Sequence, residues 1–256
     1  MTTEHSFESK TWTEIAEYIK QETILLLPIG STEAHGPHLP LATDSIISKE
    51  MAQRAASKLV SLGYKALVLP TISYSVTDFS IDFPGSISLR KETAILVLTD
   101  ILRSLIKQGF RYISIANSHL EPEHISSIVK ACQIIETETL IKISFPDKCR
   151  RKWASRLTKE FRSGACHAGS YESSLVMAAN PKLVKEEIRQ SLPANNISLS
   201  DAIRAGVTSF KDAGGSQAYF GMPAEASVAE GESSYNLLAD MLVEAIVETF
   251  PELKKI

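Results

Sequence analysis

Two carboxylates and two imidazoles lie within twelve consecutive residues, at Glu33, His35, His38 and Asp44. Carboxylate oxygens and imidazole nitrogens are ligands that divalent zinc, manganese and iron take in proteins. The same stretch holds two prolines and a glycine, so neither a regular helix nor a central strand is expected there. It follows the apolar run 24–29. The sequence therefore predicts a stiff loop that leaves a buried strand and carries metal ligands.

Histidine and glutamate recur together at two later points of the chain. His119 and Glu121 follow the strand-like run 112–116, and His167 and Glu172 lie on either side of a glycine. Six histidines scattered at random over the chain would rarely fall into such clusters. The three clusters are therefore expected to meet in one site.

Each of these residues also has a simpler interpretation. A lone histidine is most often a hydrogen-bonded structural residue. Asp44 precedes a helical pattern, where aspartate is often a helix N-cap. Neither interpretation explains the whole set, so we favour a metal site.

The number of candidate ligands indicates two ions. They are Glu33, His35, Asp44, His119 and Glu121. Five ligands are too many for one tetrahedral catalytic zinc with an open position. They suit two divalent metal ions (Zn, Mn or Fe) that share a carboxylate and hold a hydroxide near neutral pH, which attacks an amide carbonyl. His38 is expected to support the site rather than bind a metal.

Helix-like and strand-like patterns alternate along the chain, which predicts a three-layer αβα fold with a mostly parallel sheet. Strands are expected over 23–29, 65–70, 111–116 and 139–145, and helices over 12–19, 45–60, 91–108, 122–136, 150–162, 169–179, 181–189 and 227–249.

The expected topology brings the candidate ligands together. Right-handed crossovers place the carboxyl ends of all parallel strands at one edge of the sheet. The loops 30–44, 71–90 and 117–121 would converge at that edge. The loops 71–90 and 190–226 are long, as functional loops often are. Neither an internal repeat nor a linker divides the chain, so a single domain over 1–256 is expected.

Bulk properties exclude several classes of protein. The net charge of −3 offers no general attraction for nucleic acid or a membrane surface. No apolar run approaches a membrane-spanning length, and no signal peptide is visible. Three cysteines without a C-x-x-C motif predict a reduced, cytoplasmic setting. Cys166, beside His167, is read as a buried structural residue in preference to a nucleophile.

The stretch from Leu27 to Pro40, with Thr43 and Asp44, resembles the signature of the creatininase (creatinine amidohydrolase) family. Segments 83–89, 117–119, 167–174 and 221–232 resemble further parts of that family in the same order. The resemblance runs from about residue 12 to about residue 240. It implies a creatininase-like fold, a small-molecule substrate and a homo-oligomer, which in the family is a hexamer.

The resemblance also implies a role for individual residues. One ion would be held by Glu33, Asp44 and His119, and the other by His35, Asp44 and Glu121. His167 and Glu172 are the expected catalytic residues, which pass a proton to the leaving nitrogen. Ser86 and Trp153 are the expected substrate contacts, although Trp153 equally suits a place in the hydrophobic core.

Departures from the family pattern bear on the substrate. Ser163 and Gly164 stand where creatininase has a Trp-Asp pair, and Phe79 and Ser80 stand where many relatives have Glu-His. A substrate other than creatinine is therefore expected, such as a small cyclic amide or a formamide. The alternatives are hydrolysis of a keto-inositol, a lactone or a peptide, and a non-catalytic relative that keeps its metal for stability or assembly.

Two further features of the sequence leave alternatives open. Residues 148–162 carry seven basic side chains and one acid, Glu160. They form either a lid that steers an anionic substrate or, as is more common, a solvated helix face. The last helix has an apolar face, which suits either an oligomer interface or the core. That face consists of Leu237, Leu238, Met241, Leu242 and Ile246.

Overall fold

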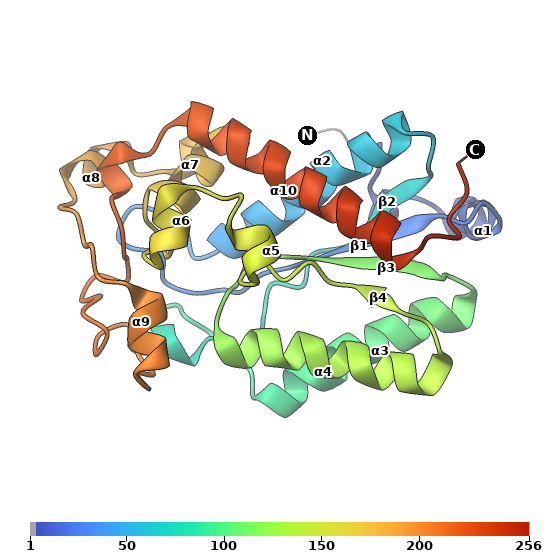
Figure 1. Ribbon diagram of the computed structural model, residues 1–256, viewed down its shortest axis with the longest axis horizontal. Coiled ribbons are helices and arrows are strands. Elements are labelled where there is room, and N and C mark those ends of the chain that lie inside the picture. Colours follow the sequence, from blue (N-terminus) through green and yellow to red (C-terminus); the bar gives the residue numbers. More distant parts are fainter. Residues whose placement is uncertain (1–3, 256) are drawn as a thin grey trace.

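A four-stranded parallel sheet forms the centre of the computed structural model, which describes residues 4–255 (Figure 1). Its order is β2-β1-β3-β4, and each neighbouring pair is parallel. The strands are β1 (Ile24–Ile29), β2 (Ala66–Val68), β3 (Tyr112–Asn117) and β4 (Ile143–Ser144). Helices cover both faces, so the predicted three-layer αβα fold is confirmed.

Two groups of helices cover the two faces of the sheet. One group is α2 (Thr43–Ser61), α7 (Ser170–Ala179) and α10 (Val228–Thr249); the other is α1 (Trp12–Lys20), α3 (Lys91–Gln108) and α4 (Pro122–Thr139). Ile24 and Leu26 pack toward the first group, and Leu25 and Leu27 toward the second. Because both faces are covered, β1 and β3 are buried along their whole length.

Short helices join these elements. They are η1 (Phe7–Ser9), η2 (Asp78–Ser80), α5 (Arg151–Ala154), α6 (Lys159–Ser163), η3 (Pro181–Leu183), α8 (Glu186–Ser191), α9 (Leu199–Arg204) and η4 (Pro223–Glu225). The helix expected over 150–162 is split in two, because Thr158 caps a new helix by accepting a hydrogen bond from the Phe161 N–H. The expected loop 190–226 contains α9.

The apolar face of α10 belongs to the core of this chain. Leu238, Met241, Leu242 and Ile246 are buried. The backbones of α10 and α7 approach so closely that a Cβ on Gly231 would collide with the Ser174 carbonyl. Of the two uses left open for this face, the structure therefore supports the core.

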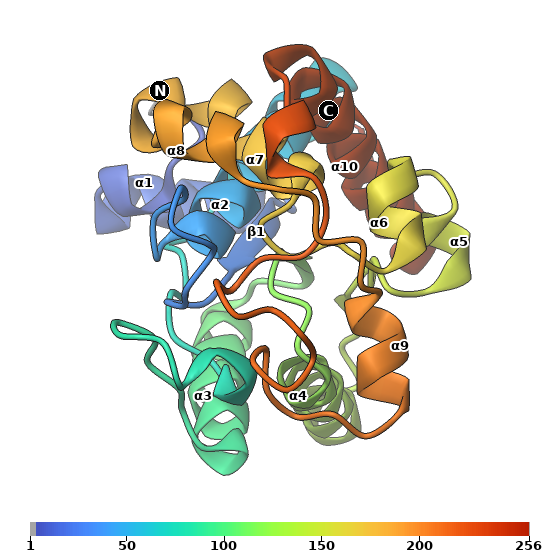
Figure 2. The ribbon, with the colours of Figure 1, turned by 90° about the vertical axis from the view of Figure 1, so that its left-hand side faces the viewer.

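The carboxyl ends of the strands lie at one end of the molecule, which faces the viewer in Figure 2. The segments after β1 and β3 meet there with α5, α6, α7 and α9. Among residues 4–255, no helix is both long and apolar enough to cross a membrane.

Candidate metal centre

The turn after β1 carries the first ligands and crosses the start of α2. A Cβ on Gly30 would lie 2.5 Å from the Ser45 nitrogen, so only glycine fits at this crossing. Asp44 lies in the first turn of α2, but Ala42 holds the N-cap position and no side chain caps the helix. The Asp44 carboxylate instead accepts a hydrogen bond from Ser31 Oγ at 2.6 Å. Asp44 therefore does not cap α2, and of its two predicted roles only that of a metal ligand remains.

Glu33, Asp44 and His119 converge in one buried group. His119 Nδ1 lies 3.1 Å from Glu33 Oε1 and 3.1 Å from Asp44 Oδ2. The other ring nitrogen, Nε2, lies 2.8 Å from the Val76 carbonyl, which fixes the direction of the ring. The Thr77 hydroxyl donates to Glu33 Oε2.

His35 occupies the centre of a second group with Asp44 and Glu172. Its Nε2 lies 3.5 Å from Asp44 Oδ1, 3.5 Å from Glu172 Oε2 and 3.7 Å from Glu33 Oε1. This nitrogen is buried and has no hydrogen-bond partner among the described residues. A buried imidazole nitrogen that faces three carboxylates without bonding to any of them fits a site for a cation.

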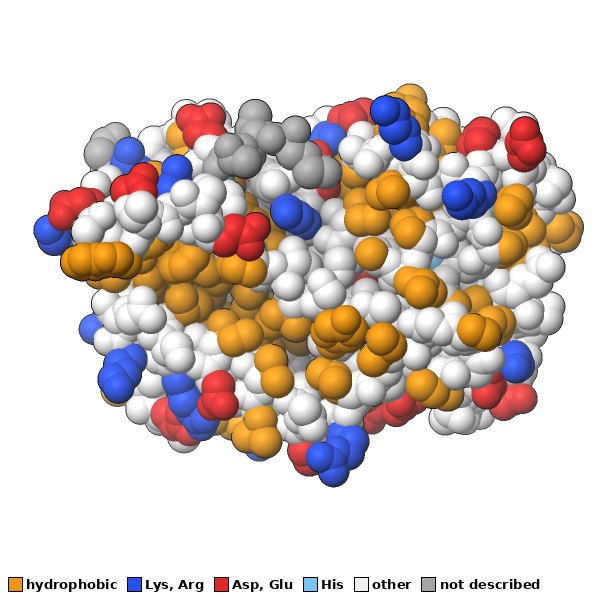
Figure 3. Space-filling view, turned by 180° about the vertical axis from the view of Figure 1, so that it is seen from behind, with side chains coloured by type: hydrophobic (Ala, Val, Ile, Leu, Met, Phe, Trp, Pro, Cys, Tyr) orange, Lys and Arg blue, Asp and Glu red, His pale blue; other side chains and the backbone are white. Residues whose placement is uncertain are grey.

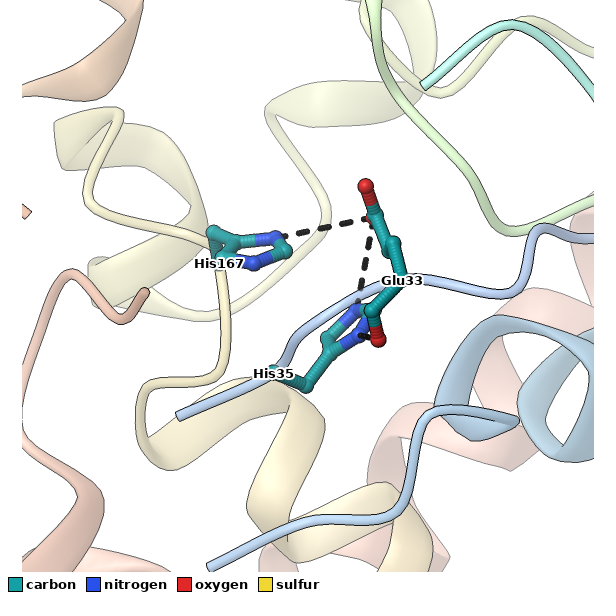
Figure 4. Close-up of side chains that lie close together, drawn as sticks. All are labelled: Glu33, His35 and His167. Carbon is teal, nitrogen blue, oxygen red and sulfur yellow. Dashed lines mark hydrogen bonds and ion pairs between the residues drawn. The ribbon is translucent and has the colours of Figure 1, made fainter. Parts of the chain in front are cut away.

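The rings of His167 and His35 both face the Glu33 carboxylate (Figure 4). His167 Nδ1 lies 4.0 Å from Glu33 Oε1, and His167 Nε2 lies 2.9 Å from the Ala34 carbonyl. The ring packs between His35 and Phe210, with centroids 4.3 and 4.2 Å away. Glu33, His35 and His167 form a third set of atoms that are close enough to share an ion.

The charges of the centre are strongly coupled. Burial alone would lower the pKa of His35, but Asp44, Glu172 and Glu33 raise it to about 10. Burial likewise opposes protonation of His119, yet Glu33 and Asp44 raise its pKa well above its usual value. Burial would raise the pKa of Asp44, but the imidazoles hold it well below its usual range. The site thus draws in positive charge, which a divalent ion supplies in place of protons.

The start of α7 is held by a carboxylate that sequence reasoning missed. Glu160 accepts hydrogen bonds from the Tyr171 N–H at 2.9 Å and from the Met222 N–H at 2.7 Å. A Cβ on Gly169 or Gly221 would collide with this carboxylate. In the sequence, Glu160 stood out only as the single acid of a basic segment. By holding the Tyr171 N–H, Glu160 fixes the first turn of α7, which carries Glu172.

The two candidate carboxylates for the last ligand position lie differently. Glu172 lies beside His35 and accepts a hydrogen bond from the Ala168 N–H at 2.7 Å. Glu121 lines the cavity but accepts from the Asp78 and Phe79 N–H groups at 3.0 and 3.3 Å. Burial raises the pKa of each to about 7. Glu121 is therefore near the three groups without being part of them.

Two predicted substrate contacts lie away from the cavity. Trp153 is buried in the core, with Lys152 Nζ 4.2 Å from its ring centroid. Ser86 Oγ accepts a hydrogen bond from the Ala34 N–H at 3.0 Å, which holds the loop between Glu33 and His35. Neither lies among the residues that line the cavity.

Other residues near the centre support it through hydrogen bonds. His38 Nε2 lies 2.9 Å from Ser173 Oγ, so His38 braces α7. His124 Nε2 lies 2.8 Å from Asn117 Oδ1, and Asn117 donates to the His119 carbonyl at 2.6 Å. The supporting hydroxyls of Ser31 and Thr77 carried no signal in the sequence.

A cavity of about 540 Å³ opens above these side chains. Glu33, Asp44, His119, His167 and Glu172 reach it from separate segments of the chain. Cys166 also lines it, but burial raises the pKa of its thiol, which disfavours the nucleophilic thiolate. All three cysteines are free.

The parallel sheet between helices and the buried carboxylates and imidazoles at its edge define an α/β protein with a candidate metal centre. The sequence model of the creatininase (creatinine amidohydrolase) family matches residues 8–246. The chain therefore belongs to the creatininase family.

Relatives of known name share about a quarter of their residues with this chain. A mycofactocin precursor peptide peptidase of Mycobacterium tuberculosis is 26% identical over 238 residues, covering 89% of this chain and 86% of the peptidase. A 3-dehydro-scyllo-inosose hydrolase of Thermotoga maritima is 26% identical over 190 residues, covering 71% and 58%. A creatinine amidohydrolase of Pseudomonas putida is 27% identical over 192 residues, covering 68% and 71%.

Solved structures share the fold. A crystal structure of creatinine amidohydrolase has a TM-score of 0.75 at 23% identity, covering 98% of this chain and 99% of that one. A mutant creatininase of the Zn–Zn type has a TM-score of 0.75 at 22% identity, covering 98% of this chain and 100% of that one.

Proposed function

We propose that this protein is a dinuclear metal-dependent hydrolase that cleaves the C–N bond of a small amide or formamide. The observation that carries the proposal is a pair of adjacent donor groups that share Asp44. One contains Glu33 and His119, and the other His35 and Glu172. A carboxylate common to two groups suits two neighbouring divalent ions. Zinc, manganese or iron would accept this mixture of nitrogen and oxygen ligands.

Bound ions would supply what the side chains lack, namely activation of water near neutral pH and polarisation of the carbonyl. His167 is suited to move the proton. A carbonyl oxygen only accepts, so the contact with the Ala34 carbonyl places the proton of His167 on Nε2. Burial lowers the pKa of His167 to about 4, so the ring is neutral at neutral pH and Nδ1 carries a free lone pair that can accept a hydrogen bond.

Glu172 has two possible uses in this reaction. Its pKa of about 7 suits transfer of a proton to the leaving nitrogen together with His167. Its position beside His35 equally suits a metal ligand. If Glu172 carries the proton, Glu121 is the carboxylate that completes the second ion's ligands.

Hydrolysis of a peptide is the second candidate function. The cavity of about 540 Å³ has the volume of a site for a drug-sized ligand, which exceeds the size of a simple formamide. One relative is named as a peptidase. An inosose or lactone hydrolase and a non-catalytic metal-binding protein are the remaining alternatives.

We also propose that residues 1–256 form one domain, that the chain forms a homo-oligomer and that it works in the cytoplasm. A single family match over residues 8–246 supports one domain. Exposed apolar side chains on α3 support association, and three free cysteines support a reducing compartment.

A hydrolysis screen tests the proposed reaction. The purified protein, with Zn²⁺, Mn²⁺ or Fe²⁺ added, is incubated with cyclic amides, formamides, lactones and short peptides. We expect metal-dependent cleavage of an amide or formamide that chelation abolishes. Full metal content without cleavage of any compound would instead support the non-catalytic alternative.

A further inference from the structure

The basic segment 148–162 separates into two sets of side chains. Arg150 lies 3.6 Å from Asp147, Lys152 lies 2.5 Å from Glu248, and Arg156 lies 2.6 Å from Glu244. These three are neutralised by acids, two of them on α10. Lys148 is buried beneath the surface. Lys159 is exposed to solvent. Five of the seven basic side chains are therefore paired, buried or solvated without reaching the cavity, and for these the simpler interpretation of a helix surface holds.

Arg151 and Arg162 behave differently. Both line the cavity above the candidate metal centre. Among residues 4–255, neither side chain has an ion pair or hydrogen bond. They come from α5 and α6, which lie side by side, with α9 below them in Figure 2. Arg204 of α9 also lines the cavity, but it is paired with Asp201.

The acids that line the cavity lie in the metal centre or directly beside it. The four carboxylates that line it belong to Glu33, Asp44, Glu121 and Glu172. Two divalent ions would balance four carboxylates, so the loaded centre would leave the arginines uncompensated. Unpaired guanidinium groups at the mouth of such a cavity favour a ligand that is itself negatively charged.

We propose that the substrate carries an anionic group, a carboxylate or a phosphate, which Arg151 and Arg162 bind while its amide lies at the metal centre. This inference rests on the proposed hydrolase function and specifies its substrate class. Guanidinium groups bind the oxygens of carboxylates and phosphates through paired hydrogen bonds, so they supply orientation as well as charge. Both arginines are exposed, so the attraction weakens as salt rises.

A set of matched ligands tests the proposal by calorimetric titration of the zinc-loaded protein. N-acetylglycine carries a carboxylate, N-acetylaminomethylphosphonate stands in for a phosphate, and N-acetylglycinamide is their neutral counterpart. The test variant is Arg151→Gln/Arg162→Gln. Its control, Arg150→Gln/Arg156→Gln, removes the same charge from paired arginines outside the cavity.

We expect the wild type to bind at least one anion about tenfold more tightly than the neutral amide, as charge-assisted hydrogen bonds allow. The control should keep this preference and the Arg151→Gln/Arg162→Gln variant should lose most of it. The anion whose advantage is lost identifies the group. No preference in the wild type, or one that survives in the test variant because the anion binds the ions, would overturn the proposal.

Two parallel measurements separate this inference from the proposed reaction. Zinc content should be the same in both double variants and the wild type, and a thermal unfolding scan should show that both variants are folded at the temperature of the titration. If the arginine-dependent preference is found but the hydrolysis screen shows no amide cleavage, the reaction is wrong and the anion site stands. If amides are cleaved without that preference, only the anion site is wrong.

Discussion

His35 Nε2 lies 3.5 Å from Asp44 Oδ1, and neither atom closes this gap with a hydrogen bond to the other. Both side chains are almost wholly buried. This distance is too long for a strong hydrogen bond between a buried imidazole and a buried carboxylate. A cation bound by both side chains would account for the gap.

Removing Asp44 is expected to empty both metal sites. In Asp44→Ala, the carboxylate common to the two groups is lost, so the metal content should fall from two ions per chain to near zero. His35→Ala should lose mainly one ion. Elemental analysis of the purified variants measures this, and full metal content in Asp44→Ala would exclude the shared site.

Glu121 and Glu172 can be distinguished by the same measurement. Glutamine keeps the shape of either side chain but is a poorer ligand. The variant that loses one ion identifies the carboxylate that completes the second site. The other variant should keep both ions, and equal retention in both would remove each of them from the ligand set.

Glu160 is expected to stabilise the fold through α7. Glu160→Ala leaves the buried N–H groups of Tyr171 and Met222 unpaired, at a cost of about 1–3 kcal/mol each. Glu160→Gln, which keeps one acceptor, should cost less. Denaturant unfolding measures the loss, with exposed Glu187→Ala as a control that should change little. A stability equal to wild type in Glu160→Ala would contradict this role.

His38 is expected to make the fold less stable in acid. Burial lowers its pKa to about 4 in the folded protein, against about 6.5 in the unfolded chain. The unfolded state therefore takes up the proton first, so stability is lost as the pH falls from about 6.5 toward 4. For one group this reaches roughly 3 kcal/mol.

Replacement of His38 isolates that contribution. In metal-free protein, the free energy of unfolding of His38→Gln should fall less between pH 7 and pH 4.5 than that of the wild type. Because the other titrating groups are common to both proteins, their effects cancel in the comparison. If the free energies of unfolding of the two proteins fell in parallel as the pH is lowered, His38 would have the same pKa in the folded and unfolded states, and the prediction would be wrong.

A homo-oligomer is expected from the face in Figure 3, where apolar side chains are widely exposed. Leu96 and Val97 of α3 are 59% and 39% exposed, and Tyr74 shares a hollow with Val97. Light scattering should report a multiple of the 28.1 kDa chain. Leu96→Glu/Val97→Glu should weaken assembly, whereas Val247→Glu on α10 should not. A wild-type mass of one chain at micromolar concentration would reject the oligomer.

Local patterns were sufficient to predict the layers of the fold. The apolar runs that become β1 and β3 are continuous because helices cover both of their faces, and such runs are readable without a structure. The ends of shorter elements were less predictable. The strand expected over 139–145 is shorter and covers only Ile143–Ser144. An edge strand extends only as far as its neighbour pairs with it, here β3, and that pairing cannot be predicted from the residues of the edge strand alone.

The chemistry of the centre was also readable in part. Glu33, His35 and Asp44 lie close together in sequence, and their place in a stiff loop after a predicted buried strand identified them as candidate ligands. The choice between Glu121 and Glu172 was not readable, because the two lie 51 residues apart and reach the same cavity on different elements.

The sequence by itself determined the αβα class, the edge of the sheet where the ligands gather and the residue types that hold a divalent ion, since all three follow from local patterns and chain order. Only the tertiary structure decided which charges are paired. Arg150 and Arg151 are neighbours in the chain, yet one faces Asp147 and the other an open cavity. Pairing depends on what distant segments bring alongside a side chain, and that information is absent from its immediate neighbours in sequence.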